Sequence, residues 1–176
     1  MQLRYYTNIN FKIFRALVFA EKNYNSIVPD INLIDEDCLL LARVNKEIAD
    51  YISVIENGKF REGIRHILSI SRLGNQLMQA SQPWVLCKGN EEEQNRGKTV
   101  IGLSVNLTCL LSILLHPYMP QTSEVIKSQL NAPSEVYILR DKFTLLLKPG
   151  HQLGKVKIFL LWIKDRFELF FNLCVF

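Results

Sequence analysis

The sequence predicts an all-α protein, built as an antiparallel bundle of about five helices. Apolar residues recur at steps of three and four over several long stretches, which is the spacing of one face of an α-helix. Glycine and proline are scarce, with 8 and 6 in 176 residues, so we expect long uninterrupted elements. No stretch alternates apolar and polar residues over the length of a strand. Because 48% of the residues are apolar, the chain can bury a core of its own.

The first two helices are expected over residues 9–23 and between Asp35 and the pair Asn57-Gly58. In the first, apolar and basic residues fall on different faces. In the second, Asp35 is the expected N-cap, because an aspartate side chain accepts hydrogen bonds from the free N–H groups of a first turn. The carboxylates at 36 and 37 follow where the helix dipole favours anions, and we expect them to be solvated. Asn-Gly is a natural C-terminal stop.

The third helix is expected from about Lys59 to Gln79, and it has an unusual polar face. Guanidinium and amide side chains, with one serine, recur along it at steps of three and four. We call this set the polar stripe: Arg61, Arg65, Ser69, Arg72, Gln76 and Gln79. Gln82-Pro83 ends the helix, and Trp84 follows directly.

Two further helices complete the expected bundle. Asn90 can cap the fourth through its side-chain oxygen, and this helix stops before Pro117. It includes residues 99–115, which carry no charge. Their length is close to the minimum for a membrane-spanning helix. We interpret them as the buried central helix of the bundle. Pro120 suits the first turn of the fifth helix, which ends near Leu130.

The net charge and the cysteine spacing limit the kinds of function that the chain can have. The formal net charge is +4 and the pI is about 8.9, which is compatible with a polyanionic partner. The four cysteines form no Cys-x-x-Cys pair and have no histidine at metal-ligand spacing. We therefore expect no disulfide framework, no metal site and a reducing, cytoplasmic location. Basic residues interrupt the first apolar stretch, so we expect neither a signal peptide nor a membrane anchor.

The sequence contains no complete catalytic constellation. None of the three histidines has a serine or cysteine in a nucleophile context, so we expect no catalytic residues. Trp84 stands out instead, because it lies at a helix end beside the polar stripe. A large flat ring in that position suits stacking of an unpaired RNA base. The alternative is that the ring simply packs against the end of the bundle.

Short motifs strengthen the RNA interpretation. Between Arg61 and Lys88, the chain combines S-R-L-G-N-Q with P-W and a following basic residue. Further motifs are R-G at 96–97, G-L-S-V-N at 102–106, H-P-Y-M-P at 116–120 and P-G-H-Q-L-G at 149–154. In these motifs the chain resembles the anticodon-binding domain of methionyl-tRNA synthetase, in particular the eukaryotic cytosolic kind. The resemblance implies the helical bundle of the class I synthetase anticodon-binding domains.

The resemblance also implies site residues and a partner, methionine tRNA. In the family, the tryptophan after the proline stacks on a base of the CAU anticodon, and an arginine on the first helix reads base edges. The family's second reader is an asparagine four residues before that arginine, where this chain has Phe11; Asn10 lies one position away. The expected RNA-binding residues are therefore Trp84, Pro83, Arg15, Asn10, Arg61, Arg65 and Arg72.

The chain lacks the catalytic half of that family. The signatures H-I-G-H and K-M-S-K-S, with which the family activates methionine using ATP, do not occur in it. We therefore expect no enzymatic activity from this chain alone and no cofactor in it, since ATP would belong to a catalytic domain. A synthetase catalytic domain or a multi-synthetase assembly is an implied partner.

The family pattern fades after Lys155. We expect a helical anticodon-binding domain over residues 1–156 and a divergent apolar tail over residues 157–176. This tail motivates the alternative function, a non-catalytic helical domain that docks on protein partners, because large exposed apolar patches mark interfaces.

Overall fold

The computed structural model describes residues 11–156, with side chains from residue 15 onward, and all of its regular elements are helices. The elements are α2 (Phe11–Asn23), α3 (Asp35–Glu56), α4 (Phe60–Ser81), α5 (Pro83–Leu86), α6 (Glu91–Leu115), α7 (Pro120–Leu130) and the 3-10 helix η1 (Ser134–Tyr137). The five long helices confirm the predicted bundle. The short helix α5 and the helix η1 were not predicted.

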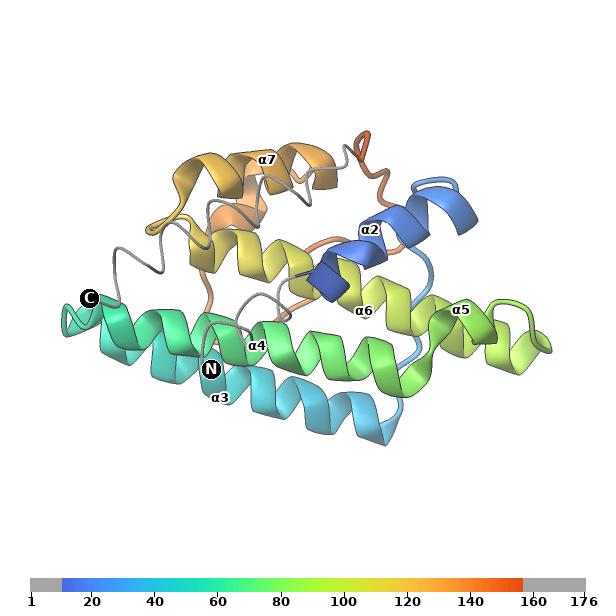
Figure 1. Ribbon diagram of the computed structural model, residues 1–176, viewed down its shortest axis with the longest axis horizontal. Coiled ribbons are helices and arrows are strands. Elements are labelled where there is room, and N and C mark those ends of the chain that lie inside the picture. Colours follow the sequence, from blue (N-terminus) through green and yellow to red (C-terminus); the bar gives the residue numbers. More distant parts are fainter. Residues whose placement is uncertain (1–10, 157–176) are drawn as a thin grey trace, which may run out of the picture.

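Helix α6 forms the centre of the molecule, and α2, α4, α5 and α7 all contact it (Figure 1). Every residue from Thr99 to Leu115 is buried. By length and composition α6 could cross a membrane, but 89% of its most apolar window is buried inside the bundle. Its hydroxyl side chains bond back to the helix; Ser104 Oγ, for example, donates to the Val100 carbonyl at 2.8 Å. The prediction of a buried central helix is confirmed.

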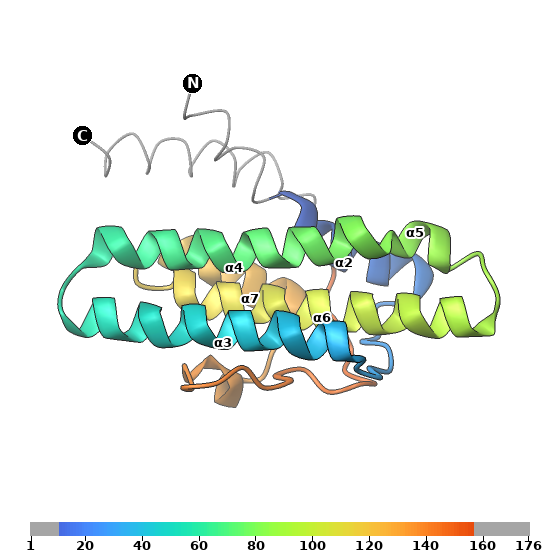
Figure 2. The same ribbon diagram turned by 90° about the horizontal axis from the view of Figure 1, so that it is seen from below.

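Helices α3 and α4 run antiparallel along one side of α6 (Figure 2). The turn between them is the predicted Asn-Gly stop: Gly58 takes a left-handed φ of 71°, which glycine adopts without strain. The Lys59 N–H then donates to the Val54 carbonyl at 2.8 Å. Helix α3 also contacts α6: the Tyr51 hydroxyl of α3 donates a hydrogen bond to the Leu114 carbonyl of α6 at 3.0 Å.

The start of α3 differs from the sequence prediction. Ile34, and not Asp35, occupies the N-cap position. The Asp37 carboxylate accepts a hydrogen bond from the Ile34 N–H at 3.1 Å and two from the Arg96 guanidinium, at 2.6 and 2.9 Å. Asp37 is 1% exposed, so the expectation of a solvated carboxylate is wrong here. The reason is tertiary: the cation that compensates its burial comes from α6.

The start of α6 agrees with the prediction. The Asn90 side-chain oxygen accepts from the Glu93 N–H at 2.9 Å, and the Glu93 carboxylate accepts from the Asn90 N–H at 2.8 Å. This reciprocal arrangement is a capping box, which satisfies two N–H groups at a helix start.

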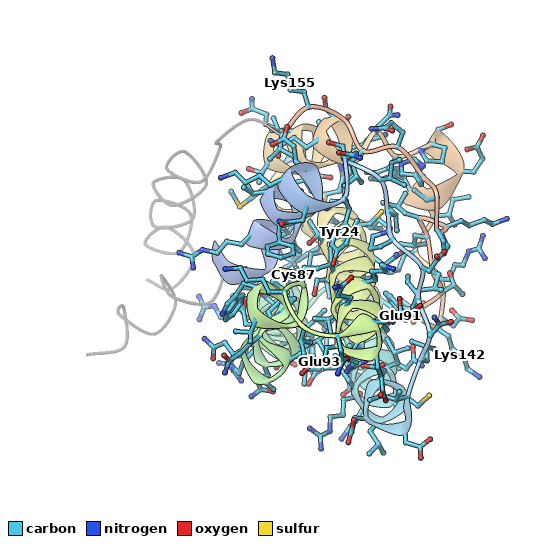
Figure 3. All side chains as sticks on the ribbon, turned by 90° about the vertical axis from the view of Figure 1, so that its right-hand side faces the viewer. Tyr24, Cys87, Glu91, Glu93, Lys142 and Lys155 are labelled. Carbon is cyan, nitrogen blue, oxygen red and sulfur yellow. The ribbon has the colours of Figure 1, made fainter. Side chains whose placement is uncertain are left out.

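Most of residues 131–156 lie on the side of the bundle opposite to α4, and the last of them pass back beside α7 and the end of α2 (Figure 2 and Figure 3). The buried Asn106 side chain holds this segment, because it accepts from the Leu147 N–H at 2.8 Å and donates to the Leu147 carbonyl at 3.0 Å. An isolated antiparallel bridge between Ile27 and Gln152 joins the segment to the loop after α2. These contacts hold the segment against α6 and against the loop after α2.

Candidate nucleic-acid interface

The polar stripe lies on the outer face of α4. Its arginines and glutamines are all exposed, and only Ser69 is half-buried. At about 100° per residue, the six positions fall within an arc of roughly 80°. The opposite face of the helix is buried and includes Ile67, Ile70 and Leu77. One helix therefore anchors in the core with one face and presents three guanidiniums and two amides to solvent with the other.

The arginines of the stripe form no ion pair with any other side chain that the structure describes. Among the side chains that the structure describes, the ion pairs are His66–Glu47, Arg96–Asp37 and Lys127–Glu124. None of these pairs uses an arginine of the stripe. Unpaired, exposed guanidiniums suit phosphate oxygens, which receive half to two-thirds of the hydrogen bonds in protein–DNA complexes.

A sharp turn connects α4 to α5. Gln82 adopts a left-handed conformation, with φ 44° and ψ 60°. It is both the C-cap of α4 and the N-cap of α5. Its N–H donates to the Met78 carbonyl at 3.2 Å, and its carbonyl accepts from the Val85 N–H at 2.8 Å. Pro83 then begins α5, where its fixed φ and missing N–H cost nothing. The chain thus changes direction within a single residue.

Trp84 projects from α5 into solvent. Its side chain is 45% exposed and that of the next residue, Val85, is 56% exposed, whereas Pro83 is buried. Leu86 is half-buried on the inner side. Just over half of the tryptophan is therefore covered by the protein, and nearly half of its surface is open to solvent. The short helix holds a partly accessible ring next to the buried Pro83.

The end of α2 meets α5 and α6 in one corner. A Cβ atom added at Gly97 of α6 would lie 3.3 Å from the Leu86 Cβ, 3.7 Å from the Cys87 nitrogen and 3.8 Å from the Tyr24 hydroxyl. Tyr24 and Cys87 lie next to each other at this end of the bundle (Figure 3). Burial raises the pKa of Tyr24, and the neighbouring Cys87 adds to this effect, so the hydroxyl stays neutral at physiological pH.

The predicted site residues therefore fall into two groups. Pro83 and Trp84 lie on α5, close to the end of the polar stripe, while Arg61 begins the stripe about 30 Å away along α4. Arg15 is exposed on α2, a helix that contacts both α4 and α6. Asn10 lies outside the described residues.

Sequence reasoning missed α5 and with it the exposed Val85. A signal was present, because proline is favoured at the first position of a helix, and the same signal identified Pro120 as the start of α7. No local sequence pattern predicts the corner at Gly97, because it brings together segments that are far apart in the sequence.

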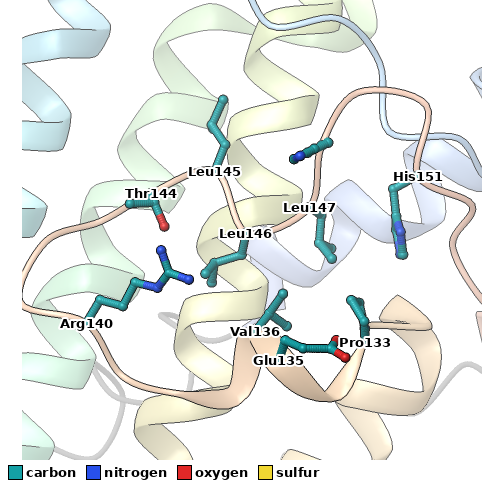
Figure 4. A pocket seen from close by; sticks show the side chains of 10 residues that line it. Pro133, Glu135, Val136, Arg140, Thr144, Leu145, Leu146, Leu147 and His151 are labelled. Carbon is teal, nitrogen blue, oxygen red and sulfur yellow. The ribbon is translucent and has the colours of Figure 1, made fainter.

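A cavity of about 550 Å³ lies in the C-terminal segment (Figure 4). Its lining includes Arg140, Thr144 and Leu146, with Glu135 and Val136 of η1. The residues that line it lie mostly on the side of the bundle away from α4, the helix that carries the polar stripe (Figure 2). Among the described residues, no group of three His, Cys, Asp or Glu side chains is placed to hold a metal ion.

Comparisons with known proteins point to one family. The family model for the anticodon binding domain of methionyl tRNA ligase matches residues 28–167. The cytoplasmic methionine–tRNA ligase of Xenopus laevis is 46% identical over 142 residues, which are 81% of this chain and 16% of that protein. The human (Homo sapiens) protein of that name is 41% identical over 150 residues, 85% of this chain and 17% of the relative. The chain thus spans about a sixth of the length of these relatives.

A solved structure has the same fold. The crystal structure of the apo form of Mycobacterium tuberculosis methionyl-tRNA synthetase superposes with a TM-score of 0.74 at 22% sequence identity. The match covers 85% of this chain and 30% of that chain. At this level of identity, the likeness concerns the fold alone.

Proposed function

Because this chain belongs to the family of anticodon-binding domains of methionyl-tRNA ligases, we propose that it binds the CAU anticodon loop of methionine tRNA. The observation that carries the proposal is the half-exposed Trp84 ring, which α5 holds beside the end of the polar stripe. Unpaired bases of an RNA loop stack on such a ring.

The two parts of the surface have different roles. Trp84, supported by the buried Pro83, stacks on one anticodon base, and stacking contributes roughly 1–3 kcal/mol per base. Arg61, Arg65 and Arg72 contact phosphates, which position the RNA without reading its sequence. Arg15 supplies guanidinium donors for acceptor atoms on the base edges.

Catalysis is assigned to another part of a longer ligase. The chain matches only the non-catalytic portion of its relatives, about a sixth of their length. Methionine activation with ATP then belongs to a catalytic domain that this chain serves as a tRNA-binding module. The names of the relatives support a cytoplasmic location, where a multi-synthetase assembly is a further candidate partner.

The direct test is binding of the 176-residue chain to an RNA stem-loop that carries the CAU anticodon. Trp84→Ala removes the stacking ring, so we expect the affinity to fall roughly 5- to 150-fold, as the loss of about 1–3 kcal/mol implies. Trp84→Phe keeps a smaller ring, so its affinity should lie between those of the parent chain and Trp84→Ala. Fluorescence anisotropy of a labelled stem-loop measures all three dissociation constants.

Leu39→Ala is the matched control. Leu39 is also a large exposed apolar residue, but it lies on α3 and contributes to neither α5 nor the polar stripe. Its replacement should leave the affinity unchanged. If Trp84→Ala binds the stem-loop as tightly as the parent chain does, the stacking role assigned to this ring is wrong.

A further inference from the structure

Gly97 is a buried glycine inside α6, at the point where α5 packs against that helix. Glycine lowers the stability of a helix interior relative to alanine, because it loses more backbone entropy on folding. Among the described glycines, positive φ values occur at Gly58 and Gly150, so the backbone at Gly97 does not require glycine. The reason for a glycine here must lie in the space around its α-carbon.

That space is taken up by α5 and the residue after it. An added Cβ would meet the Leu86 Cβ at 3.3 Å, which is tighter than about nine in ten real Cβ contacts, and would be in ordinary van der Waals contact with the Cys87 backbone nitrogen at 3.7 Å. The Leu86 Cβ is attached directly to the backbone of α5, so it cannot move away by a rotamer change. Relief of the contact requires α5 itself to shift by a few tenths of an ångström.

Other crowded glycines serve different contacts. A Cβ at Gly63 would meet the Tyr118 hydroxyl and the Ile55 side chain, and one at Gly102 would meet Ile31. Gly97 is the position at which an added methyl group would press on the element that carries Trp84. The Tyr24 hydroxyl, 3.8 Å from the same point, also brings the end of α2 into this corner.

We propose that Gly97 is a positioning residue for RNA recognition: its missing side chain lets α5 sit close to α6 and thereby fixes the orientation of the Trp84 ring relative to α2. The inference rests on the proposed function for its RNA readout, but the position of the ring is measurable without RNA. Stacking requires a ring held to within about half an ångström, so a small shift of a four-residue helix matters.

The test uses the intrinsic fluorescence of Trp84. The chain has two tryptophans, Trp84 and Trp162, so the background substitution Trp162→Phe makes Trp84 the single reporter. In this background, Gly97→Ala and Gly97→Val should push α5 outward. We expect acrylamide quenching of Trp84 to rise from glycine to alanine to valine, and affinity for the CAU stem-loop to fall on the order of 5-fold for alanine and further for valine.

Thermal unfolding separates positioning from general damage. The midpoint for Gly97→Ala should be unchanged or higher, because alanine favours the helix. Gly63→Ala is the control for crowding away from α5, since this buried helical glycine is the more tightly surrounded of the two and its neighbours, the Tyr118 hydroxyl and the Ile55 side chain, lie outside α5. It should leave quenching and RNA affinity at parental values. Leu86→Ala keeps the Cβ that faces Gly97 but removes the rest of the half-buried side chain, so it should raise quenching by loosening the packing of α5.

The outcomes distinguish this inference from the function beneath it. Parental quenching in both Gly97 variants would overturn the positioning role, as would an equal loss of affinity in Gly63→Ala. If quenching rises as expected while Trp84→Ala in the same background binds RNA like the parent, the packing role of Gly97 stands and the stacking function fails.

Discussion

Asp37 is a buried carboxylate whose partner lies 59 residues later in the chain. Its position beside two other acidic residues indicated only an acidic first turn of a helix. Nothing in the local sequence points to Arg96 as its partner. The pairing arises from the packing of α3 near the start of α6, which periodicity cannot report. The same limit applies to Gly97, whose neighbours come from α2 and from α5 with the residue after it. Trp84, in contrast, could be singled out from sequence because its ring type and its place after a helix end are both local.

The Asp37–Arg96 pair yields a stability prediction. Asp37→Ala leaves the Arg96 guanidinium and the Ile34 N–H without their acceptor, so we expect it to lower the free energy of unfolding by roughly 3 kcal/mol. Asp35→Ala, at an exposed position in the same turn, should cost less than about 1 kcal/mol. Urea denaturation measures both values, and equal losses would show that the buried pair contributes no more than an exposed charge.

At the scale of elements, helix starts and stops were the most predictable features. Side chains that cap or break helices act within a few residues, so Asn90, Pro120 and the Asn57-Gly58 pair located real boundaries. Helix α5 was missed because four residues are too short for a periodic pattern. The element that carries the candidate stacking residue was therefore the one that the sequence described least well.

The capping box at the start of α6 can be tested on its own. Asn90→Ala removes the acceptor for the Glu93 N–H, so we expect a loss of about 1 kcal/mol in the free energy of unfolding. Asn90→Asp retains an acceptor at the same place and should be close to neutral. Thermal and urea unfolding provide the measurement. An alanine variant as stable as the parent would mean that the cap is not important for α6.

At the scale of the whole molecule, the two sides of the bundle differ. Helix α4, with the exposed arginines and glutamines of the polar stripe, lies on one side, and most of residues 131–156 lie on the other (Figure 2). The bundle itself followed from periodicity, but the relation of α2, α5 and α6 at one corner depends on tertiary packing that no single segment encodes. The boundary at residue 156 and the role of the tail stay predictions, because residues 157–176 lie outside the described structure.

The central claim is that this surface recognises a methionine anticodon, and selectivity among loops tests it most directly. Two stem-loops that differ only in their three anticodon bases, one of them CAU, should be titrated against the intact chain at the same salt concentration. Phosphate contacts are the same in both, so any difference reports base recognition. We predict at least about tenfold tighter binding of the CAU loop, as roughly 1.4 kcal/mol of discrimination implies. Equal affinity for the two loops would contradict the account.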